Sequence, residues 1–193
     1  MKLKKALSFS GLASTAAAIA LVATFSGCTS VAKDPKQQQE MKVDANYALT
    51  KFYAEATNAR KMVQDAQGLL ICPGITKAGF VVGIKGGKCA MQINGVTQEY
   101  YRTTSINVGL IAGAETHSLL LIFNDINALN NFREGNRNWK VGGNLSVTVA
   151  QKGMTGAFDS KTTSAAISAF VYNEAGLMGD LSVEGSTFKK LEK

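Results

Sequence analysis

The sequence predicts an α+β domain: a curled antiparallel β-sheet or barrel-like domain with one long N-terminal helix and one short helix. Apolar residues recur at helical spacing over residues 40–67, and after Gly68 the pattern changes to that of strands. About nine short strands follow, with turn residues between them. Pro73 is the last proline, so no proline interrupts the later strands. Evenly spaced short strands are typical of a curled sheet or barrel.

The first 27 residues are typical of an export leader. A basic start, MKLKK, precedes the uncharged, alanine-rich stretch Ala6–Ala23, and Ser26-Gly27 precedes Cys28. Small residues before a cysteine resemble a bacterial lipobox, although Phe25 stands where leucine is usual. We expect cleavage before Cys28 and attachment of lipid to its thiol. An ordinary secretory signal and an uncleaved anchor are the alternatives.

The residues after the anchor predict where the domain is held. Thr29, in place of aspartate, favours the outer membrane under the sorting rule for such lipoproteins. We therefore expect a lipid-anchored protein of the bacterial envelope that faces the periplasm. Residues 28–39 are polar, contain Pro35 and show no periodicity, which predicts a flexible tether to a domain over residues 40–193. At ~3.3 Å per residue, the tether would reach roughly 35 Å.

Length and charge limit the classes of function. Removing the 27 leader residues from 193 leaves 166, which suits one domain with a sizeable core. The leader holds three of the 21 basic residues and none of the 14 acidic ones, so the net charge falls from +7 to +4. This mild basicity does not predict nucleic-acid binding, but it is compatible with anionic lipid head groups.

A long amphipathic helix is predicted over Glu40–Gln67, and Gly68 is a good helix stop. Its apolar stripe recurs at three- and four-residue spacing and consists of Ala45, Leu49, Phe52, Ala56, Ala59, Val63 and Ala66. The alanine-rich stripe favours packing against the domain. The alternative is that a basic face also contacts lipid, through Lys42, Lys51, Arg60 and Lys61.

The following strands predict a meander of hairpins. Pro73-Gly74 ends a short buried strand, and Gly86-Gly87 forms a two-residue hairpin turn. Asn94-Gly95 is the strongest turn signal, because a type I′ turn needs positive φ at both central residues. A further corner is predicted at Gly113–Thr116. The predicted strands are Leu69–Ile71, Gly79–Lys85, Lys88–Ile93, Val96–Thr103, Ser105–Ala114 and His117–Phe123.

The short helix is predicted over Asp125–Phe132. Asn124 or Asp125 caps it, and Ile126 and Leu129 lie on one side with Phe132. A polar loop is predicted later, at Gln151–Ser164. The remaining predicted strands are Trp139–Val149, Ala165–Tyr172, Leu177–Val183 and Ser186–Leu191.

Two cysteines remain once Cys28 carries lipid. Cys72 and Cys89 form an even pair in an exported chain, which is consistent with a disulfide. The alternative is two separate buried thiols, since free cysteine packs as a small hydrophobic residue.

The segment GLLICPGITKAGFVVGIKGGKCAM resembles the opening of the SYLF domain. Its matching residues are Ile71, Pro73, Lys77, Ala78, Gly79 and Phe80, with Cys72 in place of the usual aromatic. Further matches are Ser105, Gly109, Gly113, Ala169–Tyr172, Gly176–Met178, Ser182, Glu184 and Gly185. The resemblance covers Met41–Leu191. Because this family includes membrane-binding eukaryotic proteins and bacterial lipoproteins, the resemblance implies lipid or membrane binding, and it points to no catalytic residue.

The sequence contains no catalytic constellation. It has no phosphate loop and no GxSxG nucleophile elbow. His117 is the one histidine, and no cysteine stands near it at metal-ligand spacing, so we interpret it as a residue of the sheet. Acidic residues are scattered singly. We therefore predict no enzymatic activity, no metal site and no cofactor.

Two functions remain. The first is a non-catalytic lipid- or membrane-binding domain, attached to the membrane through lipidated Cys28 and able to bind anionic phospholipid. Its candidate lipid contacts are Lys77, Lys85 and Lys88, predicted at or beside the turns of the first hairpin. The alternative is an envelope structural or protein-interaction module without lipid affinity. The sequence does not identify the protein partner that such a module would bind.

Overall fold

The computed structural model describes residues 34–56, 58–79, 82–108, 113–135, 138–140, 147–149, 165–173, 176–178 and 185–191. The predicted leader, Cys28 and the first half of the predicted tether lie outside these residues. The described helices are α1 (Pro35–Glu55), α2 (Ala59–Asp65) and α3 (Ile126–Glu134). The described strands are β1 (Gly68–Gly79), β2 (Val82–Ile93), β3 (Val96–Val108), β4 (Gly113–Phe123), β5 (Asn138–Lys140), β6 (Val147–Val149), β7 (Ile167–Asn173), β8 (Gly176–Met178) and β9 (Thr187–Lys190).

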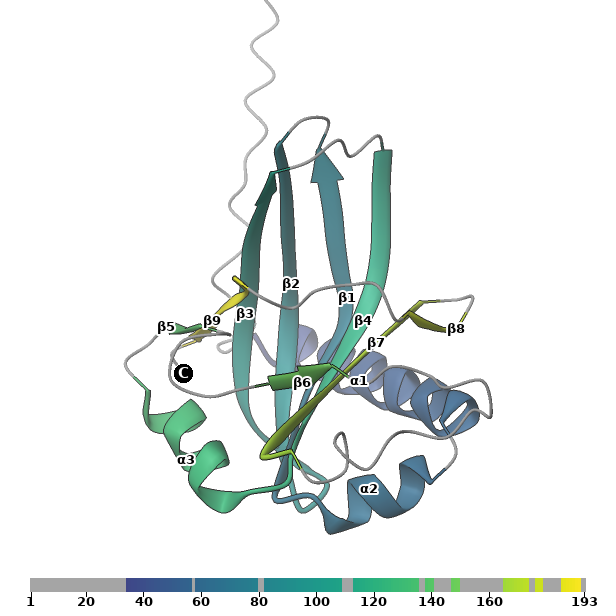
Figure 1. Cartoon of the computed structure of the whole chain (residues 1–193), viewed down its shortest axis with the longest axis vertical. Helices are drawn as coiled ribbons and strands as arrows, with labels where there is room; N and C mark the ends of the chain where they lie inside the picture. Colours follow the sequence, from purple (N-terminus) through teal and green to yellow (C-terminus); the bar gives the residue numbers. More distant parts are fainter. Residues whose placement is uncertain are drawn as a thin grey trace, which may run out of the picture.

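One sheet contains all nine described strands. Their order is β5-β9-β3-β2-β1-β4-β7-β6, and β8 pairs with β7. The long strands β1–β4 stand side by side, and shorter strands continue the curled sheet at both edges (Figure 1). The pairings are antiparallel, except that β6 runs parallel to β7. The predicted α+β fold with a curled, mainly antiparallel sheet is therefore confirmed.

Helix α1 crosses one face of the sheet and begins earlier than predicted. The side chain of Asp34 caps it by accepting a hydrogen bond from the backbone N–H of Lys36, at 2.9 Å. Pro35 takes the first helical position, where a missing N–H costs no helical hydrogen bond. The predicted start at Glu40 is therefore wrong, because the proline that favoured a tether is a helix-start residue here.

The predicted helix over Glu40–Gln67 is two helices. Ala56, with a φ of −112° and a ψ of 118°, ends the first helix, and Asn58, with a φ of 67° and a ψ of 6°, precedes the second in a left-handed conformation. The predicted apolar stripe nevertheless packs on the sheet, with Ala45 and Phe52 completely buried. Among the described residues, no helix is both long and apolar enough to cross a membrane.

The first hairpin turns at a different place from the one predicted. Strand β2 runs unbroken through Gly86-Gly87, and its connection to β1 falls at residues 80–81, outside the described residues. Gly87 serves close packing instead, since a Cβ there would lie 2.9 Å from the carbonyl oxygen of Gly74. The turn at Asn94-Gly95 is confirmed, with φ values of 52° and 74°.

Strand β1 also continues through Pro73-Gly74, where the sequence predicted its end. Its register shifts there against both neighbours, between Ile71 and Thr76 against β2 and between Cys72 and Ile75 against β4. Proline has no N–H to donate to a ladder, and an irregular pairing accommodates it within the strand.

Strands β3 and β4 are also longer than predicted. Strand β3 continues past the break predicted at Thr104, and β4 begins at Gly113, so the predicted corner Gly113–Thr116 belongs to a strand. The short helix is confirmed as α3, and the Asp125 side chain caps it by accepting from the N–H of Ala128 at 2.8 Å. The predicted loop Gln151–Ser164 lies outside the described residues.

The structure joins Cys72 of β1 to Cys89 of β2 in a disulfide. Both residues are completely buried on neighbouring strands. Of the two alternatives for this cysteine pair, the structure contains the bonded one.

Apolar side chains pack on both faces of the sheet. On the face that α1 crosses, here called the α1 face, Ile71 and Ala90 belong to one core cluster with Phe52. On the opposite face, here called the α3 face, Met91 belongs to a second cluster with Phe132 of α3. Because side chains alternate along a strand, this division assigns neighbouring strand residues to opposite faces.

Candidate functional site

The three lysines predicted as lipid contacts do not form one patch. Lys77 and Lys85 are paired across β1 and β2, and they lie at even spacing from Ile75 and Cys89 of the α3-face core. Lys88 is an odd number of positions from Lys85, so it lies on the α1 face. The prediction that all three flank hairpin turns is wrong for Lys85 and Lys88, because β2 does not turn at Gly86-Gly87.

A polar row crosses four strands on the α3 face. Ser105 of β3 pairs with Lys85, Lys85 with Lys77, and Lys77 with Glu115 of β4. Directly opposed residues on one face have Cβ atoms about 4.5–5.5 Å apart. The row therefore places one carboxylate beside two ammonium groups that lie far from it in the sequence.

Burial changes the chemistry of this row. Lys85 is only 7% exposed, and desolvation lowers its pKa; the charge of Lys77 lowers the pKa further, while Glu115 opposes the shift. An ammonium group in this position is withdrawn from the protein surface. The α3-face lysines are thus poorly placed to meet an external surface together.

His117 follows Glu115 on the same face of β4. It is 5% exposed, and its Nδ1 is buried without a hydrogen-bond partner in the part of the chain that the structure describes. Desolvation lowers its pKa, the charge of Lys85 adds to this effect, and Glu115 opposes it. Among the described residues, no group of three or more His, Cys, Asp and Glu side chains is placed to hold a metal ion.

Lys88 lies beside the beginning of α1. Its ammonium group donates to Gln37 Oε1 of that helix at 3.1 Å. Its paired residue in β3 is Arg102, whose Nη2 is buried and has no hydrogen-bond partner within the described ranges. Two cations therefore stand side by side on the α1 face. No pattern in the sequence indicated Arg102.

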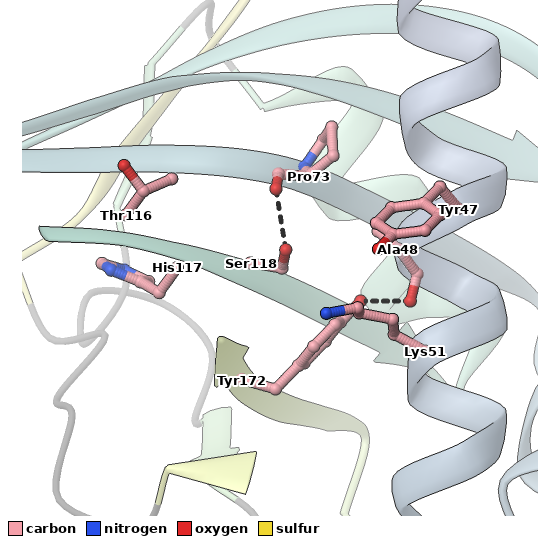
Figure 2. A pocket seen from close by; sticks show the side chains of 8 residues that line it. All are labelled: Tyr47, Ala48, Lys51, Pro73, Thr116, His117, Ser118 and Tyr172. Carbon is pink, nitrogen blue, oxygen red and sulfur yellow. Dashed lines mark hydrogen bonds between the residues drawn. The ribbon is translucent and has the colours of Figure 1, made fainter. Parts of the chain in front are cut away.

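A small pocket lies where α1 meets β1, β4 and β7 (Figure 2). The Ser118 hydroxyl donates to the carbonyl oxygen of Pro73 at 2.7 Å, and the Tyr172 hydroxyl donates to that of Ala48 at 2.9 Å. Its volume is about 120 Å³, whereas small-molecule sites occupy roughly 300–1,000 Å³. It is too small to enclose a lipid acyl chain. The lining residues are Tyr47, Ala48, Lys51, Pro73, Thr116, His117, Ser118 and Tyr172.

Glu99 joins β3 to two other elements through its carboxylate. It accepts hydrogen bonds from Arg133 of α3 at 3.0 Å, from Lys190 of β9 at 2.6 Å and from the Tyr101 hydroxyl at 2.7 Å. Burial alone would raise the pKa of Glu99, but these hydrogen bonds outweigh burial and hold the pKa at about 2. All of these partners are the protein's own, so Glu99 stabilises the fold.

Comparison with known proteins identifies part of the chain. No curated protein matches it. Residues 104–193 match the Ysc84 family, which is described as "Las17-binding protein actin regulator" and is the family of the SYLF domain. The matched region begins in β3 and contains β4, α3 and the later strands. Residues 104–193 are therefore similar to the Ysc84, or SYLF-domain, family, which is the family that the sequence resemblance indicated.

Proposed function

We propose that this chain is a lipid-anchored protein of the cell envelope whose folded domain binds anionic phospholipid membranes without catalysis. The observation that carries the proposal is the match of residues 104–193 to the SYLF-domain family. This is a family of non-catalytic, lipid-binding-type domains.

The proposed anchor would keep the domain close to a bilayer. Asp34, the cap of α1, is six positions after Cys28. An extended chain of that length spans ~20 Å. Lipid on Cys28 would therefore hold the start of α1 within that distance of the membrane surface.

Surface contact is the favoured mode of lipid binding. The pocket beside α1 is too small for an acyl chain, while the exported chain keeps a net charge of +4. Basic side chains near an anionic bilayer each contribute about 1 kcal/mol to binding. We therefore expect affinity for head groups rather than extraction of a whole lipid.

The alternative function is an envelope protein-interaction module without lipid affinity. It is favoured by the description of the matched family, which names a Las17-binding protein. The two functions differ in one property, which is the affinity of the isolated domain for lipid vesicles.

Co-sedimentation with vesicles tests the lipid-binding function. Residues 29–193, which retain every residue that the structure describes, are mixed with vesicles of phosphatidylethanolamine and phosphatidylglycerol, or of phosphatidylcholine alone. We expect sedimentation with the anionic vesicles at low salt and release as salt rises, because salt screens the attraction. Absence of binding to anionic vesicles at low salt would reject lipid binding and leave the protein-interaction module.

The anchor needs a separate measurement. Mass spectrometry of the full chain expressed in a bacterium is expected to find an N-terminal peptide that begins at lipid-modified Cys28. Cys28→Ser is the control and should abolish the modification. An unmodified N-terminus elsewhere in the first 33 residues would reject the lipoprotein proposal.

A further inference from the structure

Three basic side chains form a continuous row on the α1 face. Lys88 of β2 pairs with Arg102 of β3, and Arg102 pairs with Lys189 of β9. Paired residues point to the same face, with Cβ atoms about 4.5–5.5 Å apart, so the row is about 10 Å long. We call these three residues the basic row.

The basic row has no acidic partner among the described ion pairs. Those pairs are Lys36–Glu40, Lys61–Asp65, Arg133–Glu99 and Lys190–Glu99. Like charges directly opposite each other across strands are destabilising. The three basic side chains therefore repel one another, and an external anion would reduce this repulsion.

One nitrogen of Arg102, at the centre of the row, also lacks a hydrogen-bond acceptor among the described residues. Its Nη2 is buried and unpartnered within the described residues, although each guanidinium N–H is a strong donor. Lys88 donates to the neutral amide oxygen of Gln37. Asp34, the cap of α1, already accepts from the N–H of Lys36 and from Gln37 Nε2, at 2.9 and 3.2 Å.

The basic row stands where the chain enters the domain. The hydrogen bond from Lys88 to Gln37 fixes the row beside the first turn of α1. The cap of that turn, Asp34, is six positions after Cys28, within ~20 Å of a bilayer if Cys28 carries lipid. The tether would therefore present this part of the α1 face to the head groups.

Two exposed apolar side chains share the face of the basic row. Ile84 and Ile106 are paired across β2 and β3, and they are 62% and 73% exposed. They lie four positions from Lys88 and Arg102 respectively, which is an even spacing on each strand. Adjacent basic and apolar side chains are typical of surfaces that bind the membrane interface.

We propose that the basic row of Lys88, Arg102 and Lys189 is the surface with which the domain docks on anionic phospholipid head groups. The inference deepens the proposed function and rests on it. Ile84 and Ile106 add apolar contact at the interface. The lysines of the polar row, on the α3 face, do not take part.

Charge-neutral variants test the assignment. Arg102→Gln with Lys189→Gln removes two charges from the basic row, and Lys88 is kept because it bonds α1. Arg60→Gln with Lys61→Gln is the matched control, since it removes one arginine and one lysine from the exposed helix α2. In Figure 1, α2 lies below the long strands and away from β9. Both variants are made in residues 29–193 and measured with phosphatidylethanolamine–phosphatidylglycerol vesicles.

We expect the row variant to bind the vesicles about 30-fold more weakly. Each of the two removed charges contributes roughly 1 kcal/mol to binding, and about 1.4 kcal/mol corresponds to a tenfold change in affinity. The α2 control should stay within about twofold at ~0.1 M salt, where the screening length is roughly 10 Å. Equal losses of affinity in both variants would overturn the assignment to the basic row, even though the parent chain bound lipid. No binding by the parent would instead reject the proposed function.

A charge-keeping variant separates docking from folding. Arg102→Lys with Lys189→Arg retains two positive charges and should bind within about threefold of the parent chain, since head-group attraction depends mainly on charge. Thermal unfolding of all variants identifies any that do not fold. Loss of binding by the folded charge-keeping variant would also overturn the assignment.

Discussion

Replacing Glu99 by glutamine should destabilise the fold in a way that depends on pH. The Glu99 side chain is 10% exposed and holds Arg133 and Lys190 as ion pairs. Its pKa in the folded protein is about 2, against an ordinary value of 4.5. At 1.36 kcal/mol per pKa unit, the ionised carboxylate contributes about 3 kcal/mol to the free energy of unfolding at neutral pH.

The direction of the pH effect follows from the lowered pKa. Below about pH 4.5 the unfolded chain takes up a proton on Glu99, while the folded protein keeps the carboxylate ionised down to about pH 2. The contribution is therefore complete above pH 4.5 and is lost as the pH falls to 2. Glu99→Gln should lower the free energy of unfolding by about 3 kcal/mol at neutral pH and by less than about 1 kcal/mol near pH 2.

Urea denaturation of residues 29–193 across this pH range measures the difference directly. Glu40→Gln is the control, because Glu40 is 60% exposed and its contact with Lys36 is a surface pair at 4.0 Å. Such pairs contribute little, so the control should change the free energy by less than about 1 kcal/mol at every pH. A cost for Glu99→Gln that stayed the same from neutral pH to pH 2 would refute the reasoning.

Two further predictions concern the packing of β1 against β2. Gly87→Ala should cost about 1–3 kcal/mol in thermal or urea unfolding, because its Cβ would meet the carbonyl oxygen of Gly74 at 2.9 Å. Gly86→Ala is its matched control, with the nearest atom at 3.8 Å, and an equal cost for both would contradict the packing. Non-reducing mass spectrometry should find a peptide pair linked through Cys72 and Cys89, and replacing both by alanine should cost roughly 2–4 kcal/mol. Free thiols at Cys72 and Cys89 in the non-reduced protein would contradict the disulfide.

The sequence predicted the parts of the fold that depend on local periodicity. The helical stripe identified side chains of the helices that pack on the sheet, and Asn94-Gly95 identified the hairpin between β2 and β3. Prediction from the sequence failed where a residue suits two different local structures. Pro35 suits a tether or the first turn of a helix. Gly86-Gly87 suits a turn or a place where two neighbouring strands approach closely. Only the surrounding packing decides between them.

The basic row was not predictable because it depends on strand register. Counting outward from the Asn94-Gly95 turn pairs Ile93 with Val96, and the same count would pair Lys88 with Tyr101. The register shifts by one between Met91 and Gln92, so Lys88 meets Arg102 instead. A one-residue shift exchanges the faces of a strand, and no local signal marks this one.

The same dependence on register explains the outcome for the candidate lysines. Lys77 and Lys85 were predicted at or beside hairpin turns, but β1 and β2 pair them directly, and Lys85 is buried between β1 and β3. Glu115, which was interpreted as an isolated acid, stands beside Lys77 for the same reason. Long-range pairing, rather than composition, therefore determines which charges remain at the surface.

An environment-sensitive fluorophore on each face tests the central claim most directly. With Cys72 and Cys89 bonded, residues 29–193 offer no other thiol, so a cysteine at Thr104 or at Asn131 can be labelled alone. Both positions are exposed; Thr104 lies between Arg102 and Ile106 on the α1 face, and Asn131 lies on α3. We predict a blue shift at Thr104, and none at Asn131, when phosphatidylglycerol-containing vesicles are added. A shift at Asn131 alone, or at neither position while the protein sediments with the vesicles, would contradict docking through the α1 face.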